Sequence, residues 1–144
     1  MQGSIKSNLG TLNEALSEYL LIHDAIFSQN IGKTPNYQTL KEDLIRIIED
    51  VKDMESSLKI GFQLMQRLNR SSKEIKEIDL VLNYTSSLLE AQNSLLVVIT
   101  KLHEKSKGEV YNYFSYVRDV NKYKRSRKKY GALGRRLNLL MRSY

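Results

Sequence analysis

The sequence predicts an all-α fold, an elongated antiparallel helical bundle or coiled coil of three long helices with short terminal helices. Apolar residues recur every three or four positions over long stretches, which is the period of a helix. Two Ser/Thr-x-x-Glu motifs have the form of helix capping boxes. One Pro and seven Gly in 144 residues leave few turns for a fold of many strands. The length fits a single domain, 1–144, with a basic C-terminal segment at about 122–144.

The first helix is expected at about 12–29. Thr11-x-x-Glu14 would cap its start, and Gly32 and Pro35 would end it and open the next segment. The residues expected on its apolar face are Leu12, Leu16, Tyr19, Leu20, His23 and Ile26.

The second helix, expected at about 37–70, has the most regular pattern. Its apolar seam keeps strict three- and four-residue spacing and is interrupted only by Gly61, which indicates either a close backbone approach or a tolerated helical glycine. Such a seam predicts coiled-coil packing against another long helix, and we expect self-association to cover it. The seam begins with Tyr37 and Leu40. The residues expected to form the seam and oligomer interface are Leu44, Ile47, Val51, Met54, Leu58, Met65 and Leu68.

The third helix is expected at about 73–106, between the capping box Ser71-x-x-Glu74 and Gly108. Thr85 and Gln92 fall on its apolar stripe, where they either fix the register of packing or lie at a solvated edge. The apolar set is Ile75, Ile78, Val81, Leu82, Leu88, Leu89, Leu95, Leu96, Ile99 and Leu102.

A fourth helix is expected at about 109–129, followed by a break at Tyr130-Gly131 and Gly134 and by a short closing helix. The residues expected to be buried in the fourth helix are Val110, Tyr113, Phe114, Val117 and Val120. Those expected on the apolar face of the closing helix are Leu137, Leu140, Met141 and Tyr144.

Catalytic and metal-binding motifs are absent from the sequence. The chain has no Cys, and neither His23 nor His103 follows a Glu by three residues, as a di-iron bundle would require. No nucleotide-binding or nucleophile motif occurs. We therefore expect a non-enzyme without metal or cofactor. The longest apolar run, at 95–99, is far shorter than the roughly 20 residues of a membrane span, so a cytoplasmic protein, free or at a membrane surface, is expected.

Positive charge is concentrated at the C-terminal end. Residues 101–144 carry 13 Lys and Arg against 3 Asp and Glu, whereas residues 1–100 carry 10 against 13. Six of the nine tyrosines lie in this basic region. Cations interleaved with aromatic rings suit anionic membrane or exposed nucleic-acid bases. The candidate contacts to an anionic surface are Lys122, Lys124, Arg125, Arg127, Lys128, Lys129, Arg135 and Arg136.

Residues 111–127, YNYFSYVRDVNKYKRSR, together with the two long helices before them, resemble the BAR domains of sorting nexins. The resemblance implies a three-helix antiparallel coiled coil that dimerises and lays cationic faces on anionic membrane. BAR domains are usually longer than this chain, and their first helix is longer than the one expected here. Residues 88–95, LLEAQNSL, resemble the paired long helices of FlgN-type flagellar export chaperones, which are generally acidic.

These observations predict a non-enzymatic interaction module with one of three kinds of binding partner. Association of the basic end with an anionic membrane surface ranks first. A chaperone, adaptor or scaffold that binds another helical protein ranks second. Nucleic-acid binding ranks third, because the fourth helix lacks the polar spacing of a recognition helix. The expected partners are a second copy of the chain or another helical protein, and the membrane surface.

Overall fold

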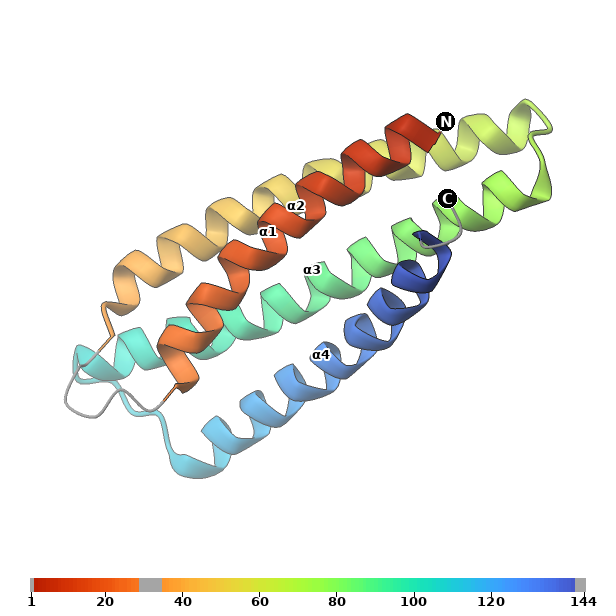
Figure 1. Cartoon of the computed structure of the whole chain (residues 1–144). Coiled ribbons are helices and arrows are strands. Elements are labelled where there is room, and N and C mark those ends of the chain that lie inside the picture. The colour runs from red at the N-terminus through yellow and green to blue at the C-terminus, as the bar shows by residue number, and fades with distance from the viewer. Residues whose placement is uncertain (1, 29–34, 142–144) are drawn as a thin grey trace.

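The described residues form four long helices that run up and down in an antiparallel bundle (Figure 1). The structure is a computed structural model that describes residues 2–28 and 35–141. Its helices are α1 (Gln2–Phe27), α2 (Tyr37–Arg67), α3 (Ser72–Ser106) and α4 (Tyr113–Met141). No strand occurs in the described ranges. The predicted all-α bundle is confirmed, but four long helices replace the expected three with short terminal ones.

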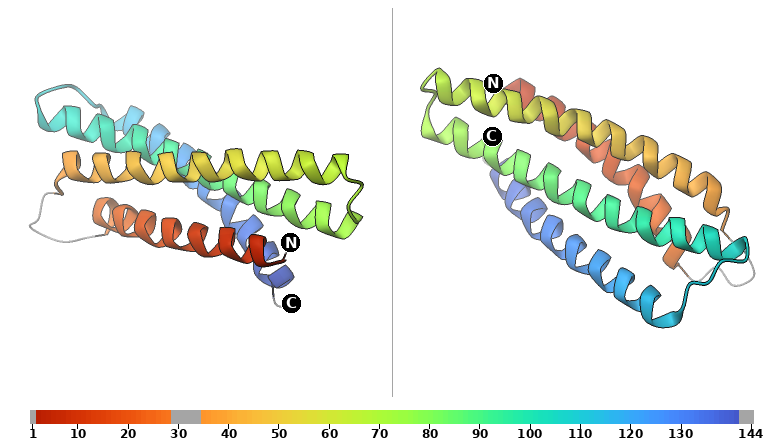
Figure 2. Two further views of the ribbon diagram at one scale, coloured as in Figure 1. Left: turned by 90° about the horizontal axis from the view of Figure 1, so that it is seen from above. Right: turned by 180° about the vertical axis from the view of Figure 1, so that it is seen from behind.

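Helix α3 occupies the centre of the bundle and packs against each of the other three helices. Helices α2 and α4 lie on opposite sides of it, and α1 lies across α2 and α3 (Figures 1 and 2). The hydrophobic core follows α3 along its length, and Val81, Leu88, Leu95 and Ile99 are fully buried there. All four helices therefore depend on the apolar surface of α3.

Helix α1 begins at Gln2, about ten residues before the expected start. The predicted capping box at Thr11 is wrong, because the Thr11 hydroxyl lies inside the helix and donates to the Ser7 carbonyl at 3.2 Å. A Thr hydroxyl commonly satisfies itself in this way within a helix. Of the expected apolar face, Leu12 and Tyr19 are fully buried and the other members are half-buried. Gly32 lies outside the described residues.

Helix α2 buries its predicted seam against α3 of the same chain. Leu44, Ile47, Val51, Leu58 and Met65 are buried, and Met54 is half-buried. Leu68 does not belong to the seam: it is 64% exposed, because α2 ends at Arg67 and the chain turns there. A Cβ at Gly61 would lie 3.2 Å from the Ile78 side chain, so this glycine marks a close approach of α2 to α3.

Helix α3 has the predicted start and end. The Ser71 hydroxyl accepts a hydrogen bond from the Glu74 backbone N–H at 3.3 Å, and Gly108 adopts a φ of +104°, which favours glycine. Thr85 and Gln92 are fully buried, so the solvated-edge interpretation is wrong. The Thr85 hydroxyl donates to the Val81 carbonyl at 2.8 Å, whereas the Gln92 amide has no hydrogen-bond partner among the described residues.

Helix α4 continues without a break through Gly131 and Gly134, so the predicted separate closing helix is wrong. A Cβ at Gly134 would lie 3.2 Å from the Tyr84 ring, which indicates that this glycine lets α4 approach α3 closely rather than ending a helix. Of the residues expected on the closing helix, Leu137 is buried and Leu140 half-buried. The Met141 side chain and Tyr144 lie outside the described part.

Replacing Val51 by Asp should unfold the bundle or lower its stability by about 3–5 kcal/mol, because an unpaired carboxylate would be buried between α2 and α3. The matched control is Lys52→Asp at the neighbouring exposed position, which should change stability by about 0.5 kcal/mol or less. Denaturant titration followed by circular dichroism measures both. Equal stability of the two variants would show that the seam is not buried at Val51.

Replacing Gly131 by Ala should stabilise the protein by up to about 1 kcal/mol, because alanine is the better residue in a helix interior and its methyl group meets only the flexible end of Arg135. Gly134→Ala should gain less or lose stability, since the Tyr84 ring must move. Thermal unfolding of the two variants provides the comparison. No gain at Gly131 would contradict a helix that is continuous through this position.

Candidate anionic-surface site on helix α4

Helix α4 turns one face to the bundle and leaves its cations on the other. Its buried residues Val120, Tyr123, Tyr130 and Leu137 recur at helical spacing. Nine Lys and Arg and a single Asp lie in Tyr113–Met141, a net charge of +8 on one helix. Because the apolar positions are taken up by the core, most of these cations are exposed to solvent. We define the basic face as Lys122, Arg125, Lys128, Lys129 and Arg136.

The structure places seven of the eight candidate cations on the surface. Lys122, Lys124, Arg125 and Lys128 are exposed and have no ion-pair partner among the described residues. The list of exposed candidates is completed by Lys129, Arg135 and Arg136. The Lys129 ammonium lies 3.4 Å from the Glu90 carboxylate. Both groups are exposed, so this ion pair contributes little to stability. Arg127 differs from the others, because it is half-buried and turns toward α1.

An apolar tip stands at the N-terminal end of α4, next to these cations. Val110, Tyr113 and Phe114 are 91%, 74% and 85% exposed, and the Tyr113 and Phe114 rings meet edge to face. Their predicted burial is wrong: Val110 precedes α4, which begins at Tyr113, and Phe114 lies nine residues before the buried Tyr123, on the opposite side of the helix. Exposed aromatic and branched residues beside cations are typical of interaction surfaces. We call these three residues the apolar tip.

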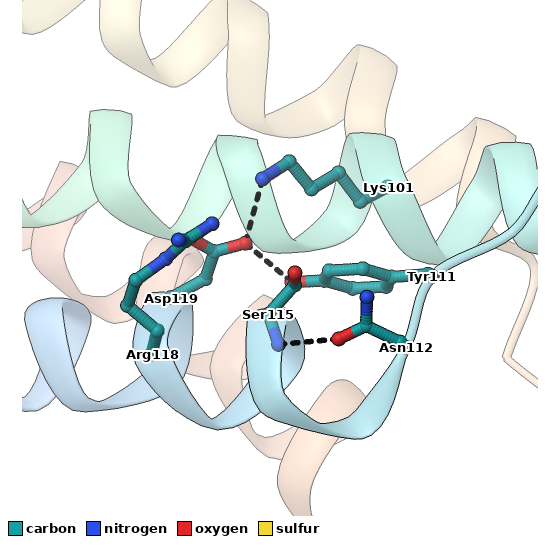
Figure 3. A network of polar contacts seen from close by, with 6 residues as sticks. All are labelled: Lys101, Tyr111, Asn112, Ser115, Arg118 and Asp119. Atoms are coloured by element: carbon teal, nitrogen blue, oxygen red, sulfur yellow. Dashed lines mark hydrogen bonds and ion pairs between the residues drawn. The ribbon is translucent and has the colours of Figure 1, made fainter.

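A polar network fixes the connection from which the apolar tip projects (Figure 3). The Asp119 carboxylate accepts hydrogen bonds from the Lys101 ammonium at 2.8 Å and from the Tyr111 hydroxyl at 2.7 Å. Burial alone would raise the pKa of Asp119, but these two donors outweigh it and hold the pKa below its ordinary value. The Asn112 side chain accepts from the Ser115 N–H at 2.8 Å and caps α4. The start of α4 is thereby tied to α3.

A second network joins α1 to α4 across the interior. Tyr19 and Tyr123 are hydrogen-bonded through their hydroxyls, His23 Nδ1 lies 2.7 Å from the Tyr123 hydroxyl, and Arg127 Nη1 lies 3.1 Å from His23 Nε2. Arg is only a donor, so Nε2 of His23 must accept, and the proton of neutral His23 is on Nδ1. His23 Nδ1–H then donates to the Tyr123 hydroxyl oxygen, and the Tyr123 hydroxyl donates its own proton to the Tyr19 hydroxyl oxygen.

The electrostatics of this network keep His23 neutral. Burial lowers the pKa of His23, the Arg127 charge lowers it further, and Asp24 opposes both. Burial also raises the pKa of Tyr19 and of Tyr123, so both hydroxyls keep their protons. A chain of hydrogen bonds through neutral Tyr19, Tyr123 and His23, ending at the Arg127 cation, therefore connects two helices that have no close backbone contact.

This network is not predicted by the sequence pattern. Tyr19 and His23 were placed on the apolar face of the first helix, but nothing in the pattern showed that they meet Tyr123 and Arg127. The available signal was the four-residue spacing of Tyr19 with His23 and of Tyr123 with Arg127, which puts an aromatic and a titratable group on one face of each helix. Which two faces meet is set by the topology and not by spacing.

No protein-family model, curated protein or solved structure matches this chain. Within residues 2–28 and 35–141, no three His, Cys, Asp or Glu side chains gather where they could hold a metal ion. None of the helices in those ranges has a stretch both long and apolar enough to cross a membrane.

Acidification should destabilise the bundle through His23. The pKa of His23 is lowered on folding, so neutral His23 stabilises the folded state. This stabilisation is fully present above the unfolded-state pKa near 6.5 and is lost as the pH falls below that pKa. A protonated His23 cannot accept from Arg127 and places two cations in contact. The melting temperature should therefore fall between about pH 7 and pH 5 more steeply for the natural chain than for His23→Gln. Parallel pH profiles would show that His23 has an ordinary pKa in the folded protein.

Proposed function

We propose that the chain is a non-enzymatic module that binds anionic membrane surfaces through α4. The observation that carries the proposal is that α4 carries the basic face along its length and the apolar tip at and just before its start. Cations near an anionic bilayer contribute about 1 kcal/mol each, and exposed aromatic side chains settle at the level of the lipid headgroups. The two features together supply the two signals that stable peripheral association needs.

Two features of the fold support membrane binding through α4. The core positions of α4 are occupied by contacts to α3 and α1, so the cations can meet a surface without any unfolding. The Asp119 network ties the start of α4 to Lys101 of α3, which holds the apolar tip in place before it meets lipid. A preorganised tip loses less conformational entropy on binding.

Self-association stays a prediction. The seam residues of α2 are covered by α3 within one chain, so a dimer would have to use other apolar residues. Ile60, Leu64 and Leu68 are exposed at four-residue spacing on and just after the C-terminal half of α2 and could serve it. The BAR-like dimer and the chaperone function are likewise proposals, and the membrane proposal does not depend on either.

Neutralising four cations of the basic face, as Lys122→Gln, Arg125→Gln, Lys128→Gln and Lys129→Gln together, should weaken binding to phosphatidylserine-containing vesicles by up to about a thousandfold, or about 4 kcal/mol. The matched control removes four exposed cations elsewhere, at Lys52, Lys59, Arg67 and Lys105. Both variants reduce the net charge equally, so a difference reports position. Cosedimentation with vesicles of varied anionic content measures it.

The outcomes separate the three alternatives. Loss in the α4 variant alone, with binding that rises with anionic lipid, supports the membrane proposal. Equal loss in both variants would mean that only net charge matters. Binding to duplex or single-stranded DNA with a steep salt dependence, and none to vesicles, would favour nucleic acid instead. If the chain binds neither vesicles nor DNA, a protein partner would be the explanation of the basic face.

Phe114→Ala should weaken vesicle binding by about tenfold to a hundredfold, because a large apolar side chain that inserts at the interface is lost. Its melting temperature should stay unchanged, since Phe114 is exposed in the folded chain. Unaltered vesicle affinity of this variant would show that the apolar tip takes no part in binding.

A further inference from the structure

A groove opens between α1 and α4 on the side of the Tyr19–His23–Tyr123 network that faces the apolar tip. The two helix backbones stay apart here, and only side chains bridge them. The groove has a volume of about 470 Å³, within the range of small-molecule sites in proteins. The groove reaches the apolar tip, because Tyr113 of the tip also lines it.

The walls of the groove are apolar and aromatic. Phe27 of α1 stacks on Tyr123 of α4, with ring centroids 5.8 Å apart and planes 15° from parallel. Tyr116, Val117 and Val120 continue this surface along α4. Such walls are suited to a hydrocarbon chain or a flat apolar group.

The groove also contains two cations and no acid. Lys124 is exposed and has no ion-pair partner among the described residues, and the buried Nε of Arg127 has no hydrogen-bond partner among them. No Asp or Glu is among the lining residues, and Asp24, the acid that acts on His23, lies outside them. An anionic group placed at Lys124 and Arg127 would meet two positive charges, whereas Asp24 acts on the groove only from outside its lining.

We propose that this groove binds one anionic amphiphile, a lipid with a phosphate or carboxylate head, whose head lies at Lys124 and Arg127 and whose chain lies along Phe27, Tyr116 and Val117. The inference builds on the proposed membrane function, because a membrane-bound α4 brings the groove to its ligand. Its test uses a soluble probe and does not require vesicle binding, so the two proposals can fail separately.

The probe is dihexanoyl phosphatidic acid below its micelle concentration, titrated by calorimetry into the full chain. We expect saturable binding of one molecule per chain. Dihexanoyl phosphatidylcholine and inorganic phosphate should each bind at least about tenfold more weakly than phosphatidic acid. Phosphatidylcholine lacks the net negative charge, and inorganic phosphate lacks the acyl chains. Equal binding of phosphate would show an anion site only, and equal binding of phosphatidylcholine an apolar site only. Either result, or no saturable binding, would overturn the proposal.

Two tryptophan variants of α4 form a matched pair. Asn121 lines this groove, whereas Asn138 lines a second groove between α1 and α4 nearer the other end of the bundle, and both are exposed. Asn121→Trp should fill the first groove and weaken probe binding at least about tenfold, and Asn138→Trp should leave it unchanged. Equal affinity of the two would place the probe elsewhere and overturn the assignment.

Lys124→Gln provides a second variant that leaves the core intact, and it should weaken phosphatidic acid about tenfold while sparing phosphatidylcholine. Loss of both lipids alike would contradict a head placed at Lys124. The variant with four neutralised residues of the basic face should still bind the soluble probe, whatever its affinity for vesicles. Loss of probe binding in that variant would overturn the groove as the site.

Discussion

Helix α3 is the one helix that packs against each of the others among the described residues, and this central position sets what the rest of the chain can do. One stripe of α3 stays exposed and polar, with Lys76, Asp79 and Glu90 on it. The inward positions of α3 hold apolar side chains or short ones such as Ser87, Ala91 and Ser94. Its hydroxyl groups can be satisfied within the helix, as at Thr85. Gly61 and Gly134 serve the same purpose from the neighbouring helices, where each admits an α3 side chain.

Helix α1 contacts α4 in a different way from that in which α2 and α4 contact α3. Helices α2 and α4 approach α3 closely, whereas α1 reaches α4 through side chains, among them the rings of Tyr19, His23 and Phe27 on α1 and those of Tyr123 and Tyr130 on α4. Large side chains that bridge two helices hold their backbones apart. The gap that remains on the tip side of the bridge is the groove that we assign to an amphiphile, so the hydrogen-bond network and the groove have one origin.

The parts of the fold that depend on local periodicity could be predicted from the sequence. The seam of α2, the cap at Ser71 and the stop at Gly108 all follow from residues close together in the chain. The start of α1 and the unbroken α4 could not, because Thr11 and Gly134 are ordinary helix signals whose meaning changes with what lies next to them. The site divides in the same way: exposed cations follow from composition, but the inward turn of Arg127 and the exposure of Phe114 depend on which face of α4 meets α1 and α3.

The uneven distribution of charge gives the molecule a direction as well as a net charge. Helix α4 carries +8, whereas α2, on the other side of α3, carries six acidic against five basic residues (Figure 1). The centre of charge is therefore displaced from the centre of mass by roughly the 8–10 Å that separates packed helices. This separation is comparable to the Debye length of about 8–10 Å at physiological salt. Near any charged object the protein experiences a torque as well as an attraction, and it turns α4 toward negative charge before the two touch.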